Sequence, residues 1–173
     1  LRATVKNLSR ILARYCEELS GRTLIVGVSG GTDSIALLLA LSEMVRPPFR
    51  RLVAAHFSHG IRLEAEQEEI ALVSKVAGDR DIEVVCGSSD VPRLATEMKQ
   101  SLEEAARESR YSFMVDLAIQ TNAGAIALGH TQDDQAETVL LHLSRGAGLA
   151  GVGGMWEWSK RTVIGKASGV NLL

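Results

Sequence analysis

Small, hydroxylated and acidic residues gather in one short segment: Ser29, Gly30, Gly31, Thr32, Asp33 and Ser34. An apolar run over 23–28 precedes this segment, and an apolar pattern with helical spacing begins at Ile35. This order predicts a strand, a tight turn and a helix. Adjacent glycines let the backbone turn sharply and let a ligand approach it closely. Because the start of a helix directs free N–H groups and positive dipole charge at the turn, the segment predicts a phosphate-binding loop.

The amino-acid sequence of this loop excludes two common phosphate-binding motifs. A Walker loop ends in Gly-Lys-Ser/Thr, whereas Asp33 stands where the cation would be. A dinucleotide fingerprint needs Gly-x-Gly-x-x-Gly and a later acid, whereas the next predicted strand ends around His56. A carboxylate beside phosphates is repulsive unless a divalent cation lies between them, so Asp33 implies Mg²⁺. The alternative is a tight turn in which Asp33 only favours the helix start.

A second polar group follows the predicted strand at 124–129: His130, Thr131, Asp133, Asp134 and Glu137. Thr131 can cap a helix, and acids in a first helical turn interact favourably with the helix dipole. Those roles would explain the first-turn acids without any ligand. Glu137, however, lies three residues after Asp134 on the same helical face. Two such carboxylates can hold an ammonium group or a metal ion, or accept a proton.

Two arginines, Arg107 and Arg110, lie on one face of a long predicted helix at 101–122. Ser101 and Glu104 form a capping-box pattern at the start of this helix. Both guanidinium groups could reach a phosphate or a carboxylate. The alternative is pairing within the helix, for example between Glu103 and Arg107.

The second predicted strand ends in a segment with two histidines, His56-Phe57-Ser58-His59-Gly60-Ile61-Arg62. Backbone groups and one imidazole of this segment could line an adenosine pocket, and the alternative is a structural role for both histidines. The residues that we expect to contact the nucleotide, besides the loop at 29–34, are His56, Ser58, Gly129 and His130.

Strands and helices alternate along the chain. Predicted strands lie at 23–28, 52–57, 82–86 and 124–129, and predicted helices at 34–45, 64–78, 101–122 and 133–145. This alternation predicts an α/β fold with a doubly wound, mainly parallel, Rossmann-like sheet. Ligands of such sheets lie beyond the carboxyl ends of the strands, where the three polar segments are found. Outside this core at about 20–145 we expect an amphipathic helix at 5–19, a loop and a short polar stretch around Pro92, a glycine-rich loop at 146–154, and a tail at 155–173 without a strong pattern.

The bulk composition is that of one globular domain of 173 residues, 46% of them hydrophobic and 23% charged. The net charge of −2 does not favour nucleic-acid binding by the domain as a whole. Cys16 and Cys86 lack the spacing of a metal or redox site, and we expect both to be buried. No apolar run is long enough to span a membrane and no signal peptide opens the chain, so we expect a cytoplasmic location.

Taken in order, the motifs resemble those of the PP-loop ATP pyrophosphatases, and within them the tRNA(Ile)-lysidine synthetases. The matching segments, spread over about 20–155, are Ser-Gly-Gly-x-Asp-Ser, His-Gly-x-Arg, Glu-Ala-x-Arg-x-x-Arg-Tyr, Gly-His-x-x-Asp-Asp-Gln-Ala-Glu-Thr and Arg-Gly-x-Gly-Leu. The resemblance implies a single PP-loop nucleotide-binding domain over 1–173, with ATP and Mg²⁺ bound at the first motif.

The resemblance also implies a two-step ligase reaction. ATP would adenylate the C2 carbonyl oxygen of the wobble cytidine of tRNA(Ile) and release pyrophosphate, and the side-chain amine of lysine would then displace AMP. By the same resemblance Asp33 would bind Mg²⁺, Asp134 and Glu137 would hold lysine, and Arg110 would lie near the reacting centre, where a cation stabilises phosphate charge.

Several features depart from that pattern or leave alternatives open. Similar enzymes carry further tRNA-binding domains, so we expect tRNA binding to need segments outside 1–173. An Arg-Pro-Leu-Leu-like segment of the family is replaced here by residues 156–162, Trp-Glu-Trp-Ser-Lys-Arg-Thr. A PP-loop tRNA thiolase would commonly need Cys-x-x-Cys, and NAD or GMP synthetases lack the block at 129–138. A nucleotide-binding module without full activity stays open, as does a homodimer.

Overall fold

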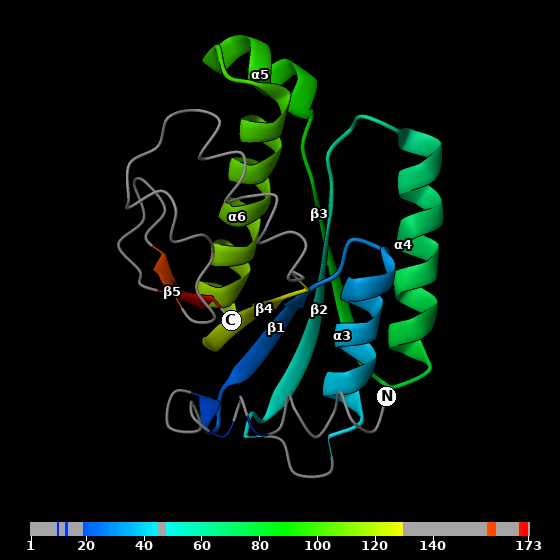
Figure 1. Ribbon diagram of the computed structural model, residues 1–173, viewed down its shortest axis with the longest axis vertical. Helices are drawn as coiled ribbons and strands as arrows, with labels where there is room; N and C mark the ends of the chain where they lie inside the picture. Colours follow the sequence, from blue (N-terminus) through cyan, green and yellow to red (C-terminus); the bar gives the residue numbers. More distant parts are fainter. Residues whose placement is uncertain are drawn as a thin grey trace.

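The computed structural model describes residues 19–44 and 48–129, the single residues Arg10 and Ala13, and the backbone of two short strands near the C-terminus (Figure 1). The strands are β1 (Thr23–Gly27), β2 (Arg51–Ser58), β3 (Glu83–Ser88), β4 (Ala123–Leu128), β5 (Ser159–Arg161) and β6 (Val170–Leu172). The helices are α3 (Thr32–Ser42), α4 (Leu63–Gly78), α5 (Val91–Met98) and α6 (Leu102–Gln120).

The strands form one sheet in the order β3-β2-β1-β4-β6-β5. All neighbouring strands are parallel except β5, which pairs antiparallel with β6. The chain passes from β1 through α3 to β2 on one side, whereas β4 returns to the other side of β1. The predicted doubly wound, mainly parallel α/β sheet is therefore confirmed. The order reverses between β1 and β4, and such a switch point leaves a crevice at the carboxyl ends of the two strands.

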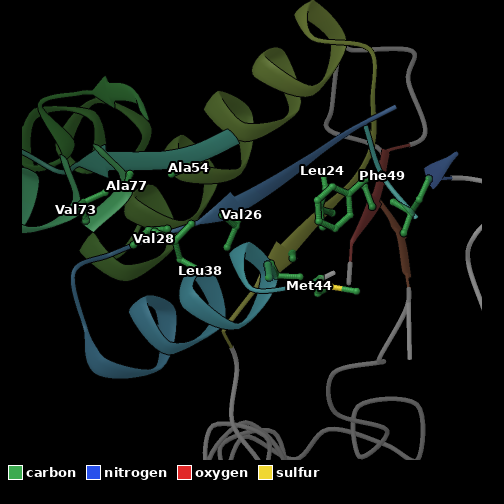
Figure 2. Packing of buried hydrophobic residues seen from close by; sticks show 13 residues of the cluster. Leu24, Val26, Val28, Leu38, Met44, Phe49, Ala54, Val73 and Ala77 are labelled. Carbon is green, nitrogen blue, oxygen red and sulfur yellow. The ribbon is translucent and has the colours of Figure 1, made fainter. Parts of the chain in front are cut away.

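Alternate residues of the strands pack on opposite faces of the sheet, because successive side chains of a strand point to opposite sides. Leu24 and Val26 of β1 pack with residues of α3 and α4, including Leu38 and Val73 (Figure 2). Ile25, between them, belongs to a second cluster that α6 covers. Figure 1 shows α3 and α4 on one side of the sheet and α6 on the other. This burial fixes the helix starts next to the carboxyl ends of the strands.

The prediction of a loop around Pro92 is wrong, because residues 91–98 form α5. Asp90 caps this helix, with its carboxylate accepting from the backbone N–H of Arg93 at 3.1 Å. Pro92 lies in the first turn, where a missing N–H costs no helical hydrogen bond. Val91 and Ala95 pack against Ala105 of α6. Tertiary packing of one apolar side therefore makes a helix from a polar stretch.

Two more expectations need correction. The tail at 155–173 contributes β5 and β6 to the sheet, although its sequence has no strong strand pattern. Cys86 is exposed instead of buried, because it lies on β3 at the edge of the sheet. The predicted helices at 5–19 and 133–145, the loop at 146–154 and Cys16 lie largely or wholly outside the described residues. Within the described part of the chain, no helix combines the length and apolarity that crossing a membrane requires.

Candidate functional site

A cleft lies at the switch point of the sheet. Its walls come from the carboxyl ends of β1, β2 and β4 and from one face of α6. The polar side chains that line it are those of Ser29, Ser34, His59 and Arg110, and Gly129 forms part of the wall. Three of the segments that the sequence singled out, at 29–34, 56–62 and 107–110, thus contribute to one cleft.

The loop after β1 is held in shape by its own hydroxyl groups. Ser34, only 8% exposed, donates from Oγ to the carbonyl of Gly31 at 2.9 Å and accepts from the backbone N–H of Ser29 at 3.2 Å. The Ser29 hydroxyl lies 3.2 Å from that of Ser34 and accepts from the backbone N–H of Gly31 at 3.3 Å. Since the single proton of the Ser34 hydroxyl is used inside the loop, Ser34 shapes the loop more than it offers a donor.

Helix α3 starts without any side-chain cap. Its N-cap residue is Gly31, with φ −70° and ψ 156°, and the helix has one first-turn acid, Asp33. Helix α4 also lacks such a cap, whereas α5 and α6 both have capping side chains, from Asp90 and Ser101. The first N–H groups of a helix have no partners within the helix. At α3 these donors therefore stay available for an anion, and the helix dipole favours one there.

Two glycines allow close packing around the loop after β1 and the start of α3. Gly30 has φ +92°, and a Cβ added there would lie 3.0 Å from Cβ and Cγ of Glu69 on α4. A Cβ on Gly129 would lie 3.1 Å from the backbone N and Cα of Ser34. Any side chain at Gly129 would thus press on the first turn of α3. Of the residues predicted to bind nucleotide, Gly30 and Gly129 therefore lie where a side chain would be strained or crowded.

Asp33 was predicted to bind Mg²⁺, and it is the acid of the first turn of α3. Its side chain is exposed in the first turn of α3. Among the described residues no group of three or more His, Cys, Asp or Glu side chains is arranged to hold a metal ion. Mg²⁺ at nucleotide sites is commonly bound by one or two carboxylates together with substrate phosphates and water. Binding of Mg²⁺ by Asp33 stays a prediction.

His56 and Ser58 occupy different environments at the end of β2. His56 is 1% exposed, and its Nδ1 lies 2.9 Å from the carbonyl oxygen of Val28. This contact ties β2 to the end of β1, which is a structural role. Ser58 is half-buried, and its carbonyl accepts from the backbone N–H of Ser89 at 3.1 Å. Direct contact of either residue with a nucleotide stays a prediction.

The loop that follows β2 is fixed by a carboxylate. Oε1 of Glu66 accepts from the backbone N–H groups of His59 and Ile61, at 3.3 and 3.2 Å, and Oε2 accepts from that of Gly60 at 3.2 Å. Burial alone would raise the pKa of Glu66, but the N–H donors of Ile61, Gly60, Arg62 and His59 together hold that pKa below its ordinary value. Glu66 was not singled out from the sequence, although it lies one turn into an acidic helix beside a glycine turn.

The two arginines of α6 have different surroundings. Arg110 is half-buried and lines the cleft, whereas Arg107 is exposed and does not. Both guanidinium groups lie near the ring of Tyr111, at 5.7 Å for Arg110 and 5.9 Å for Arg107.

The predicted capping box of Ser101 and Glu104 is present at the start of this helix. The described ion pairs do not include the alternative pair of Glu103 and Arg107. Of these two arginines, Arg110 is therefore the one that lines the cleft and could contact a ligand there.

The remaining predicted site residues, His130, Asp134 and Glu137, lie outside the described residues, as does the capping residue Thr131. The described strand β4 and Gly129 end at the cleft immediately before them. Their contribution to the site stays a prediction.

The amino-acid sequence matches the PP-loop domain family over residues 4–172. A tRNA(Ile)-lysidine synthase of Dehalococcoides mccartyi is 37% identical over 146 residues, which cover 84% of this chain and 31% of the relative. One of Thermosipho africanus is 42% identical over 133 residues, covering 76% of this chain and 31% of the relative. The chain thus spans about a third of the length of these curated relatives.

Solved structures share the fold. A U34-tRNA thiolase from Methanococcus maripaludis has a TM-score of 0.70 at 20% identity, over 84% of this chain and 50% of the thiolase. An NH3-dependent NAD synthetase from Campylobacter jejuni has a TM-score of 0.58 at 16% identity, over 84% of this chain and 61% of the synthetase. At such identities the likeness establishes the fold and no shared activity.

Proposed function

Since the chain belongs to the PP-loop domain family, we propose that it binds ATP in the cleft and serves an ATP-dependent ligase that joins lysine to the wobble cytidine of tRNA(Ile). The named relatives, 37% and 42% identical, support this assignment of substrates. Because they are about three times as long as this chain, the complete reaction is proposed for the protein that contains residues 1–173.

One observation carries the proposal of ATP binding: the start of α3, which has no side-chain cap, faces a hydroxyl-ordered glycine loop at the switch point of the sheet. The loop Ser29–Ser34, with Gly30, Gly31 and Thr32 in its centre, would bind phosphates through backbone N–H groups. The nucleoside would extend toward the end of β2, where His56 and Ser58 lie, and toward Gly129 and His130 on the other side.

Asp33 would hold Mg²⁺ against the phosphates. A bound Mg²⁺ ion neutralises phosphate charge and makes pyrophosphate a better leaving group. Arg110, half-buried in the cleft wall, would donate to the phosphate that is attacked and stabilise its developing charge. The metal role needs a negative group beside the loop, which is Asp33, and the phosphate role needs a positive one, which is Arg110.

The proposed reaction balances in two steps. The C2 carbonyl oxygen of the cytidine attacks the α-phosphorus of ATP, the bond to the pyrophosphate oxygen breaks, and pyrophosphate leaves. The lysine side-chain amine then attacks C2 and loses a proton, and AMP leaves with the oxygen. Asp134 and Glu137 would hold the ammonium group of lysine through charge-assisted hydrogen bonds.

One assay tests the whole proposal. The protein is incubated with ATP, Mg²⁺, lysine and tRNA(Ile), and AMP, pyrophosphate and the mass of the anticodon loop are measured. We expect AMP and pyrophosphate, and a mass gain that corresponds to lysine minus water. An ATP-binding module without ligase activity would bind ATP but form neither product, which would refute the proposed reaction. Since residues 1–173 carry a net charge of −2, we expect most tRNA contacts to come from outside them.

A matched pair of variants isolates the role of Asp33. Asp33→Asn removes one first-turn charge from α3, and Glu103→Gln removes one from the first turn of α6. We expect Asp33→Asn to abolish Mg²⁺-dependent formation of pyrophosphate and Glu103→Gln to leave it intact. Equal activity of the two variants would show that Asp33 acts only on the helix dipole.

A further inference from the structure

His59 occupies a position in the cleft wall that none of the roles above uses. It follows β2 directly, and its ring meets that of Phe57 edge-on, with centroids 5.2 Å apart. Both His59 and Arg110 line the cleft. Because His56 is enclosed and bonded to Val28 while His59 borders the cleft, the two histidines of this segment have separate functions.

The two ring nitrogens of His59 differ in their surroundings. Nδ1 is enclosed and has no hydrogen-bond partner among the described residues. Nε2 is not enclosed and unpartnered in this way, and His59 lines the cleft. A proton on Nδ1 would be a buried donor without an acceptor, which costs more than a buried nitrogen lone pair. The neutral ring is therefore the tautomer with hydrogen on Nε2, and it presents one donor to the cleft.

The charges around His59 keep this ring neutral. Burial is the largest influence and lowers its pKa, and the positive charge of Arg110 lowers it further. His56 acts in the same direction, while Glu66 and Glu69 act in the opposite one. The pKa of His59 lies below its ordinary value as a result, which favours the neutral ring. A neutral Nε2–H beside a guanidinium group suits an anionic oxygen that accepts from both.

The backbone at His59 is held from α4. Glu66 accepts three N–H bonds, from His59, Gly60 and Ile61. Gly60 makes the turn at φ +69°, and the carbonyl of His59 accepts from the backbone N–H of Val91 at 3.1 Å. These contacts fix the start of the side chain on both sides. Rigid placement of this kind lowers the entropy that a ligand contact must overcome.

We propose that His59 donates from Nε2 to a phosphate oxygen of the bound nucleotide that Arg110 also contacts, and that Glu66 is the positioning residue for it. The proposal rests on the proposed binding of ATP. It adds a side-chain donor from the loop after β2 to the donors of the phosphate loop after β1. Binding of the nucleoside part alone is independent of this contact.

Calorimetric titration with ATP and with adenosine tests the contact in four variants. His59→Phe keeps a ring against Phe57 but has no donor, and we expect ATP to bind about 10- to 100-fold more weakly while adenosine binds as before. His59→Gln places an amide nitrogen near the position of Nε2 and should retain most of the affinity. Glu66→Gln should weaken ATP binding by about tenfold, whereas Glu68→Gln, an exposed acid of the same helix, should not. A cooperative thermal transition well above the titration temperature confirms that each variant folds.

The outcomes separate this proposal from the proposed function. Wild-type protein that binds no ATP refutes the proposed function itself. Wild-type protein that binds ATP, with an unchanged affinity in His59→Phe, refutes the role of His59. An equal loss of ATP and adenosine affinity in His59→Phe also refutes it, because the contact would then be to the nucleoside.

Imidazole ¹⁵N spectra of the ATP-free protein provide a readout that does not depend on affinity. Four histidines contribute signals, and the His59→Gln variant assigns the one of interest. We expect a neutral ring with hydrogen on Nε2 at pH 7, and a shift of that N–H signal when ATP is added. A charged ring, or hydrogen on Nδ1, would overturn the proposed donor. In Glu66→Gln we expect the shift with ATP to shrink while the spectrum of Glu68→Gln matches the wild type.

Discussion

Two loops of the same kind border the cleft, one after β1 and one after β2, and they use their backbone donors in opposite ways. Each follows a parallel strand, contains a glycine with positive φ, Gly30 or Gly60, and leads into a helix. Both helices, α3 and α4, start without a side-chain cap, and after β1 no described carboxylate accepts the N–H groups of the loop. After β2 the carboxylate of Glu66 accepts the N–H groups of the loop. The first loop therefore keeps most of its backbone donors for the proposed phosphates, whereas the donors of the second loop are bonded to Glu66.

The difference follows from one carboxylate. A carboxylate that accepts several N–H groups does what a bound phosphate does at a helix start, so Glu66 occupies an anion position that the loop after β1 leaves open. Asp33, the acid of the first loop, lies outside on α3, where no described N–H group of the loop is bonded to it. A loop geometry common in α/β sheets thus becomes a binding loop or a scaffold depending on where its acid lies.

The largest effect is expected from Gly30→Ala. An alanine there must adopt φ near +92° with its Cβ against Glu69, which costs about 1–3 kcal/mol and shifts the loop. We expect ATP affinity to fall by about 100-fold or more, as measured by calorimetric titration. Gly78→Ala is the control, because a Cβ there meets no atom within 4 Å. If Gly30→Ala bound ATP like the control, the loop after β1 would not be the binding loop.

An intermediate effect is expected from the arginine pair of α6. Arg110→Gln removes the cation from the cleft wall, and Arg107→Gln removes an exposed cation one turn away. Loss of a charge-assisted hydrogen bond should lower kcat/KM for ATP consumption by about 10- to 100-fold in Arg110→Gln only. Both variants lose a contact with Tyr111, so a shared loss of activity would assign the effect to packing.

The smallest effect is expected in the pH dependence of stability, and it concerns the loop after β2. The pKa of Glu66 in the folded protein lies below its ordinary value of 4.5. The ionised carboxylate therefore stabilises the folded protein at pH values above 4.5, and this contribution is lost as the pH falls through the folded pKa. His59, whose folded pKa is also lowered, loses its contribution as the pH falls below 6.5.

Urea denaturation at about pH 7, 5.5 and 4 measures these contributions. Glu66→Gln should lose less stability than the wild type between the two lower pH values, and His59→Phe should lose less between the two higher ones. Glu68→Gln should follow the wild type throughout. A Glu66→Gln curve parallel to the wild type would mean that the carboxylate does not hold the loop.

The sheet could be predicted from the sequence because its strands and helices carry strong apolar periodicity. Residues 23–28 and 124–129 are continuous apolar runs, as expected of strands buried on both faces. Helix α5 escaped prediction because only Val91 and Ala95 of its residues are buried, and Pro92 indicated a loop. Strands β5 and β6 span three residues each, too few for alternation to be recognised.

The glycine turn between β1 and α3 could also be predicted, because its glycines, hydroxyl groups and acid are adjacent in the sequence. The functions of His56 and His59 could not be separated, because enclosure and exposure depend on the packing of β2 against β1 and α6. Glu66 was missed because its carboxylate reaches back to a loop whose shape only the fold defines. Contacts made by short adjacent segments are thus predictable, and those that depend on a turn geometry are not.

Backbone amide ¹H–¹⁵N spectra during a titration with ATP and Mg²⁺ test the central contrast between the two loops most directly. We expect the amide signals of Gly30 and of Thr32, Asp33 and Ser34 to shift strongly, because their N–H groups gain phosphate acceptors. Those of Gly60 and Ile61 should shift little, because Glu66 already accepts from them. Adenosine should leave both sets nearly unchanged. Strong shifts at Gly60 and Ile61 with none at Gly30–Ser34 would contradict the account.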